Sequence, residues 1–226
     1  MTKNTLVIGD THIPFELPGY LKFCKRLHKR YECSSVVHIG DLIDNHAISY
    51  WEKSTRALGA KKEMDLADKH LAPWFKAFPR VYLCWGNHDR LVARKMQSAG
   101  MPERCSKTFR EIWKLPKGWK DSFEWVLDDV LYKHGTGFSG RYAHVTAAER
   151  SRMNTVIGHT HASGGIEYLA SSRDCIFGMN VSSGIDRKAY AFDYGKDFPR
   201  KPIIGAGIIS HTKYGTNAHY IRMLMK

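Results

Sequence analysis

The sequence contains no apolar run that approaches the roughly 20 residues needed for a membrane-spanning helix. Residues 1–5 lead directly into a short apolar stretch, and no hydrophobic segment typical of a secretory signal precedes it. These two absences predict a cytoplasmic protein that has no membrane partner.

Cysteine is scarce and has no regular spacing. The five cysteines are odd in number, lie far apart and form no Cys-x-x-Cys pair, which argues against a disulfide framework and a zinc knuckle. Internal repeats, low-complexity tracts and linker-like segments are also missing. Since 226 residues suffice for one domain with a full core, we expect residues 1–226 to form a single domain, although two small ones would also fit.

Acidic residues are outnumbered by basic ones. The chain has 22 Asp and Glu against 35 Lys and Arg, which gives a formal net charge of +13. This balance favours a polyanionic partner, nucleic acid first, although a basic protein need not bind any particular anion. A composition of 43% hydrophobic and 25% charged residues is typical of a globular protein.

Apolar runs and helical periodicity predict a chain of alternating strands and helices. A strand at 5–9, a helix at 17–30 and a strand at 35–39 predict a parallel βαβ unit. We expect residues 90–120 to be helical at first and then irregular, and β-rich runs from residue 165 onward to form a second, more antiparallel sheet. The other predicted elements are a helix at 63–78, a strand at 80–85, a hairpin at 123–133, a helix at 140–151 and a strand at 155–158.

Polar side chains with oxygen or imidazole donors follow five of these strands. The carboxyl ends of strands in one α/β sheet converge on one edge, so these side chains are expected to line one crevice. Singly, each has an ordinary alternative: an aspartate in a turn, an asparagine capping a helix, histidines in loops. Five coincidences make those alternatives the weaker interpretation. The seven residues are Asp10, His12, Asp41, Asn87, His134, His159 and His161.

Seven donors exceed the needs of one metal ion, and two divalent ions about 3.5–4 Å apart, bridged by a carboxylate, would use them all. Mixed Asp, Asn and His donors suit manganese, iron or zinc and speak against a calcium or magnesium site built only from oxygen. We therefore expect two divalent metal ions as cofactors, manganese first, with iron, zinc, nickel or cobalt as alternatives.

Five blocks along residues 9–161 resemble, in order, the signature of the calcineurin-like metallophosphoesterase superfamily. This resemblance implies an α/β fold, a four-layer α/β/β/α sandwich in which two mixed sheets are flanked by helices. It also implies a two-metal centre at the strand ends. The blocks are Asp10-x-His12, Gly40-Asp41-x-x-Asp44, Gly86-Asn87-His88-Asp89, His134 and Gly158-His159-x-His161.

The resemblance also implies a role for each residue. His88 would contact the phosphate or protonate the leaving group, Asp89 would orient His88, and Asn87 would help His88 to bind the substrate. Arg90, in a basic segment just after this block, is a further candidate substrate contact. A hydroxide that bridges the two metals would attack phosphorus in line. One ion would be held by Asp10, His12, Asp41 and His161, and the other by Asp41, Asn87, His134 and His159.

One motif of this sequence differs from that of the protein-phosphatase branch of the superfamily, and the difference bears on the substrate class. The protein-phosphatase branch has Gly-Asp-x-x-Asp-Arg-Gly, whereas Asp44 is followed here by Asn45 and His46, so the phosphate-gripping arginine is absent. The chain looks more like the phosphodiesterase and repair-nuclease side, including small stand-alone forms from bacteria and their viruses. We favour a phosphodiesterase or nuclease acting on nucleic acid. The alternative is a small-molecule phosphomonoesterase or nucleotide phosphodiesterase; a Ser/Thr protein phosphatase and a catalytically dead binding module are less favoured.

Basic segments with nearby aromatic residues support a nucleic-acid partner. They could follow a phosphate backbone while the aromatic rings stack on bases. The alternative is that the charged helix faces are simply solvated and the rings belong to the core, and the oligomeric state is left open. The segments are 22–30, 56–62, 90–95 and 187–188, and the aromatic residues are Tyr50, Trp51, Trp113 and Trp119.

Overall fold

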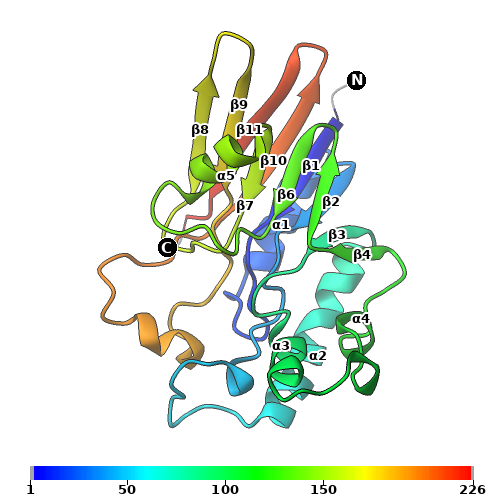
Figure 1. Ribbon diagram of the computed structural model, residues 1–226. Coiled ribbons are helices and arrows are strands. Elements are labelled where there is room, and N and C mark those ends of the chain that lie inside the picture. The colour runs from blue at the N-terminus through cyan, green and yellow to red at the C-terminus, as the bar shows by residue number, and fades with distance from the viewer. Residues whose placement is uncertain (1–2, 225–226) are drawn as a thin grey trace.

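The computed structural model describes residues 3–224, which fold into two mixed β-sheets stacked face to face (Figure 1). In the first sheet the strand order is β11-β10-β1-β2-β3-β4, with parallel pairing from β1 to β4 and antiparallel pairing from β1 through β10 to β11. Its strands are β1 (Lys3–Ile8), β2 (Ser35–His38), β3 (Val81–Cys84), β4 (Trp119–Ser122), β10 (Gly205–Thr212) and β11 (Gly215–Arg222).

The second sheet has the order β5-β6-β7-β9-β8. The pairs β6–β7 and β7–β9 are parallel, while the edge strands β5 and β8 run antiparallel to their neighbours. The hairpin predicted at 123–133 is β5–β6, turned at Asp128 and Asp129, which both have positive φ. The strands are β5 (Glu124–Leu127), β6 (Val130–Lys133), β7 (Asn154–Ile157), β8 (Gly165–Ala170) and β9 (Cys175–Asn180).

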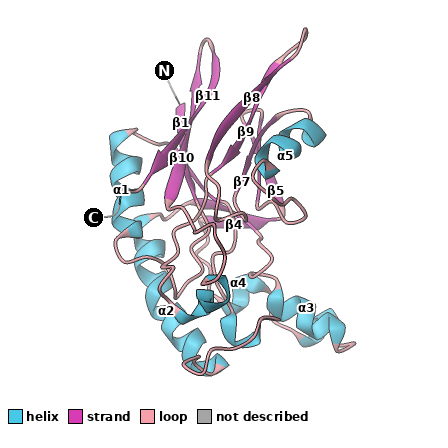
Figure 2. Ribbon diagram, turned by 90° about the vertical axis from the view of Figure 1, so that its left-hand side faces the viewer, coloured by secondary structure: helices cyan, strands magenta, loops and turns pink. Residues whose placement is uncertain are grey.

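Helices cover the outer face of each sheet, which completes the four layers. Figure 2 shows α1 and α2 along one side of the sheets and α5 on the opposite side. The α-helices are α1 (Tyr20–Arg30), α2 (Ala60–Ala77), α3 (Leu91–Ser98), α4 (Phe109–Ile112) and α5 (Ala143–Ser151). Short 3₁₀ turns are η1 (His46–Ile48), η2 (Glu103–Cys105) and η3 (Tyr190–Gly195).

The alternation of side chains along β1 divides the core into two layers. Leu6 and Ile8 are buried against α1 and α2, whereas Val7 faces the second sheet. This is the two-residue period of a strand with both faces covered. The layer between the sheets is filled by side chains such as Phe177 and Met179 from β9.

Three expectations from the sequence require correction. The segment from residue 165 onward does not form a sheet of its own, because β8 and β9 join the second sheet and β10 and β11 extend the first. The irregular end of 90–120 contains strand β4, which pairs with β3. Trp113 and Trp119 are fully buried core residues, so they cannot stack on bases. Within residues 3–224 we also find no helix that combines the length and apolarity of a membrane span.

Candidate metal centre

Five strand ends from both sheets meet at one edge of the sandwich. The sequence predicted one sheet edge, but β1, β2 and β3 belong to the first sheet whereas β6 and β7 belong to the second. The two sheets are packed face to face with these carboxyl ends together, so the crevice lies between them. This arrangement brings together all seven predicted donors: Asp10, His12, Asp41, Asn87, His134, His159 and His161.

The local backbone is shaped around two carboxylates. His12 and Asp41 both adopt left-handed φ angles, of 48° and 46°, a costly conformation that is common at functional sites. A side chain at Gly86 would collide with the Asp41 carboxylate, and one at Gly158 would collide with that of Asp10. Glycine at these two positions therefore leaves room for the buried carboxylates.

The first donor set joins Asp10, His12, Asp41 and His161, whose ligand atoms all lie within 4.8 Å of one another. His161 Nε2 lies 3.0 Å from Asp10 Oδ2 and 3.2 Å from His12 Nε2. His12 Nε2 lies 3.4 Å from Asp41 Oδ2. These are the four residues that the resemblance assigns to one ion.

The second donor set is centred on His134, at the end of β6. Its Nε2 lies 3.1 Å from Asn87 Oδ1, 3.1 Å from His159 Nδ1 and 3.2 Å from Asp41 Oδ2. Asp41 therefore contacts both sets, as a bridging carboxylate must.

The hydrogen-bonding pattern of both sets calls for cations. His134 Nδ1 lies 3.2 Å from the carbonyl oxygen of Ile39, which can only accept, so Nδ1 carries the proton and a neutral ring presents a lone pair at Nε2. His12 Nδ1 donates likewise to Asp44 Oδ1 at 2.6 Å, which turns its Nε2 lone pair toward the first set. Lone pairs that converge at about 3 Å cannot satisfy one another, and two divalent cations fit this donor arrangement.

The same crowding appears in the pKa values. Burial would raise the pKa of Asp41, but His134 and His88 outweigh burial and hold it well below its ordinary value. Burial would lower the pKa of His134, but Asp41 and Asp10 raise it to about 9, so these carboxylates favour a positive charge at Nε2, which a proton or a metal ion can supply. Asp10 Oδ1 is buried and has no hydrogen-bond partner among the residues that the structure describes. The site thus contains negative charge that its own donors do not fully satisfy.

His88 is held by Asp44, which differs from the predicted orienting role of Asp89. His88 Nδ1 donates to the Asp44 carbonyl oxygen at 2.6 Å and lies 3.5 Å from Asp44 Oδ1. The Asp89 carboxylate instead accepts the backbone N–H groups of Gly86 and Ile43, at 2.9 and 3.1 Å. Asp89 therefore fixes the loop that carries Asn87 and His88, while Asp44 orients the rings of His12 and His88.

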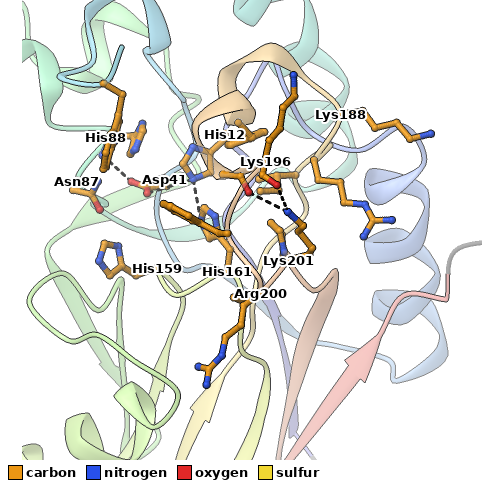
Figure 3. A pocket seen from close by; sticks show the side chains of 18 residues that line it. His12, Asp41, Asn87, His88, His159, His161, Lys188, Lys196, Arg200 and Lys201 are labelled. Atoms are coloured by element: carbon orange, nitrogen blue, oxygen red, sulfur yellow. Dashed lines mark hydrogen bonds and ion pairs between the residues drawn. The ribbon is translucent and has the colours of Figure 1, made fainter. Parts of the chain in front are cut away.

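A cavity of about 650 Å³, here called the metal cavity, opens over the donor sets. On one side it is lined by His12, Asp41, Asn87, His88, His159 and His161. The long segment between β9 and β10 forms the opposite side (orange in Figure 1). Its cations, here called the basic wall, are Arg187, Lys188, Lys196, Arg200 and Lys201. Figure 3 labels the last four of them.

The basic wall is anchored to the rest of the site. Phe192 packs its ring edge-on against His12, with centroids 5.6 Å apart. Lys201 Nζ donates to the Lys196 carbonyl oxygen at 2.6 Å, and Lys196 Nζ pairs with Asp193 at 2.7 Å, so both lysines brace the segment itself. Of this wall the sequence indicated only Arg187 and Lys188, although the length of the segment was a usable signal, since loops this long are often functional.

Most of the other predicted substrate contacts lie outside the metal cavity. The Arg90 guanidinium stacks on Phe123, 4.6 Å from the ring centroid, and Arg90 does not line the cavity. Trp51 lines it and is 54% exposed, whereas Tyr50 does not line it and has the Lys95 ammonium 3.8 Å from its ring centroid. Of the basic segments proposed from the sequence, only 187–188 reaches this cavity.

Known proteins resemble this chain in sequence and in fold. The gene 54 protein of Mycobacterium phage L5 is 26% identical over 186 residues, which cover 73% of this chain and 71% of that protein. Vacuolar protein sorting 29 from Cryptosporidium parvum has a TM-score of 0.48 at 13% identity, with 99% of each chain covered. The nuclease MPE of Pseudomonas putida has a TM-score of 0.42 at 15% identity and covers 97% of this chain and 87% of its own.

A match to a family model shows to which protein family the chain belongs. The model of the calcineurin-like phosphoesterases matches residues 3–180, a span that contains every donor of both metal sets. The basic wall lies beyond the matched residues. With most of its length matched, this chain belongs to the calcineurin-like phosphoesterase family.

Proposed function

We propose that the protein is a phosphodiesterase that hydrolyses nucleic acid with two divalent metal ions. The observation that carries this proposal is the pair of donor sets that share Asp41 and face a basic wall across the metal cavity. Its family uses a pair of divalent ions, and the mixed donors here suit manganese first.

The metal ions would neutralise phosphate charge and bring the pKa of a bound water toward about 7. The chain's own donors decide where the ions lie. Asp10, His12 and His161 would hold one ion, and Asn87, His134 and His159 the other. Asp41 would hold both, and its second oxygen, Oδ1, is fixed by the backbone N–H of His88 at 2.8 Å.

His88 is placed to move a proton. Because its Nδ1 donates to the Asp44 carbonyl oxygen, Nε2 remains for the metal cavity that His88 lines. A protonated His88 would donate from Nε2 to the leaving oxygen, a role that typically contributes about 10²–10⁴ in rate. The Asp41 and Asp44 carboxylates beside the ring favour the protonated form and raise its pKa despite burial.

The environment of Asn45 disfavours a protein phosphatase. Asn45 occupies the position at which that branch carries its phosphate-gripping arginine, and its Nδ2 donates to the His88 carbonyl oxygen at 3.0 Å. It therefore supports the His88 loop and leaves phosphate binding to other groups. The cations on the opposite side of the cavity suit a chain of several phosphates better than one isolated dianion.

One experiment tests both halves of the proposal. Metal content of the purified protein is measured, the protein is chelated, and manganese is added back before a substrate panel. The panel holds bis(4-nitrophenyl) phosphate, 4-nitrophenyl phosphate, and single- and double-stranded DNA. We expect two metals per chain, and manganese-dependent cleavage of the diester and of DNA. Activity confined to the monoester would overturn the nucleic-acid assignment, and no hydrolysis with manganese restored would overturn the enzymatic one.

A further inference from the structure

A second hollow of about 400 Å³ adjoins the metal cavity. Ala162 and Arg200 line both spaces, so Arg200 marks the passage between them. Figure 3 shows the Arg200 side chain directed away from Asp41, toward the strands below it. The hollow lies next to the His159–His161 turn, which carries one donor for each metal set.

The lining of this second hollow suits a nucleotide. Arg141 and Arg200 supply positive charge, and among the described residues no carboxylate pairs with either of them. Tyr142 is 58% exposed, and the Arg141 guanidinium lies 5.6 Å from its ring centroid, so the two side chains form one surface that combines an aromatic ring with a cation. The exposed Glu167 carboxylate can accept from an amino group of a base while repelling a phosphate beside it.

The metal cavity and the second hollow share Arg200, and together they could hold two successive nucleotides of a nucleic-acid strand. A substrate that ended at the scissile phosphate would leave the second hollow empty and its two arginines without a role. A strand places a charged phosphate on each side of every nucleoside, and the lining of the hollow offers an aromatic ring, Tyr142, together with two arginines, Arg141 and Arg200. Single strands are commonly bound in this way, by cations along the backbone and aromatic side chains under the bases.

We propose that the second hollow binds the nucleotide next to the scissile phosphate, with its base stacked on Tyr142 and its far phosphate bound by Arg141. Arg200 contacts the strand where it leaves the metal cavity. This subsite rests on the proposed nuclease function and adds to it a preference for strands of at least two nucleotides on that side of the cut.

The test compares long and short substrates in variants of the exposed lining residues. We measure kcat/KM with manganese for bis(4-nitrophenyl) phosphate and for an oligothymidylate of four nucleotides, in wild type, Arg141→Ala and Tyr142→Ala. Arg173→Ala is the matched control, because it removes an exposed arginine at the opposite end of β8. We expect the ratio of oligonucleotide to small-diester kcat/KM to fall about tenfold for Arg141→Ala and about 5- to 100-fold for Tyr142→Ala, and to stay at the wild-type value in the control.

A binding measurement separates the subsite from catalysis. Fluorescence anisotropy of a labelled oligothymidylate with the chelated protein needs no turnover, and Arg141→Ala and Tyr142→Ala should raise Kd by similar factors while Arg173→Ala does not. Unchanged ratios and unchanged Kd in both variants, or equal losses in Arg173→Ala, would overturn the subsite. If neither substrate is hydrolysed, the proposed function fails, and the Kd values still decide whether the hollow binds nucleic acid.

Discussion

Asp41 is the residue on which both donor sets depend. Its Oδ2 lies 3.4 Å from His12 Nε2 in one set and 3.2 Å from His134 Nε2 in the other. Asparagine tolerates the left-handed backbone of this position but supplies no negative charge, so Asp41→Asn tests the bridge without a change of shape. We expect metal affinity to fall by about 100-fold or more at both sites, measured as metal content by mass spectrometry.

His159→Ala is the matched control for Asp41→Asn, because His159 belongs to the second set alone. This variant should retain one metal per chain, whereas Asp41→Asn should retain neither after desalting. Two tightly held metals in Asp41→Asn would show that this carboxylate does not bridge them.

His88 should matter for rate and not for metal content. His88→Ala removes the proton donor but none of the proposed metal donors, so we expect two bound metals and a loss of about 10²–10⁴ in kcat. A loss of less than about tenfold, with both metals present, would exclude the general-acid role. The pH–rate profile of the diester provides a second readout, because its descending limb should disappear in this variant.

Asp44 should affect both metal binding and turnover, because it holds the rings of His12 and His88. Asp44→Asn should lower metal affinity about 10- to 100-fold, the usual effect of removing a partner of a ligating histidine. Asp89→Asn is the comparison, since among the described residues the Asp89 carboxylate accepts hydrogen bonds only from backbone N–H groups, and the metal affinity of this variant should fall less. A larger loss of metal affinity in Asp89→Asn than in Asp44→Asn would support the orienting role that the sequence predicted for Asp89.

These residues show how far local sequence reasoning reaches. The donors could be predicted because each directly follows an apolar run, and strand ends in this class of fold gather at one edge. The contact between His12 and Asp44 joins residues 32 positions apart, and the choice between Asp44 and Asp89 for His88 depends on how two loops cross. No local pattern encodes that crossing.

At the level of elements, the apolar strands were predictable and their partners less so. β4 has only Trp119 as an apolar residue, and it forms because β3 offers an edge and Trp119 Nε1 can donate to the Phe78 carbonyl oxygen at 2.8 Å. The division of the last four strands between two sheets is decided by pairing with β1 and β7, distant in sequence. Pairing of this kind is tertiary, and strand propensity does not reveal it.

Helix α2 is tied to the turn η1 by a buried carboxylate. Glu63 is only 4% exposed, its Oε2 accepts the Ala47 N–H at 2.9 Å, and burial raises its pKa to about 7. The unfolded chain loses this proton near pH 4.5, so native stability falls as pH rises from there through 7. Glu63→Gln cannot ionise and should escape this loss.

The expected signature is a pH-dependent difference in stability between Glu63→Gln and wild type. The free energy of unfolding of the variant relative to wild type should rise by about 2–3 kcal/mol between pH 4.5 and pH 8. Urea unfolding of the chelated proteins at both pH values measures it and removes the contribution of bound metal. A difference that is the same at both pH values would show that Glu63 keeps an ordinary pKa.

For the whole molecule, the structure shows which part of the net charge of +13 lies at the metal cavity. The net charge alone left open whether the protein binds a particular polyanion. The basic faces of several helices do not line the metal cavity. The 187–201 segment, in contrast, contributes cations to the lining of the metal cavity. A long substrate bound along this wall must displace counterions, whereas a small diester displaces few.

Salt should therefore separate the two kinds of substrate. If three cations neutralise single-strand phosphates, a plot of log kcat/KM against log salt should have a slope of about −2, so that activity on DNA falls more than tenfold between about 50 and 200 mM salt. Hydrolysis of bis(4-nitrophenyl) phosphate by the same preparation, which reports on the metals alone, should change less than about twofold. Replacing both Arg187 and Lys188 with alanine should flatten the DNA slope by about one per cation engaged and leave the small-diester curve in place. Parallel curves for the two substrates would mean that the basic wall does not contact the strand, and that the excess positive charge serves another purpose.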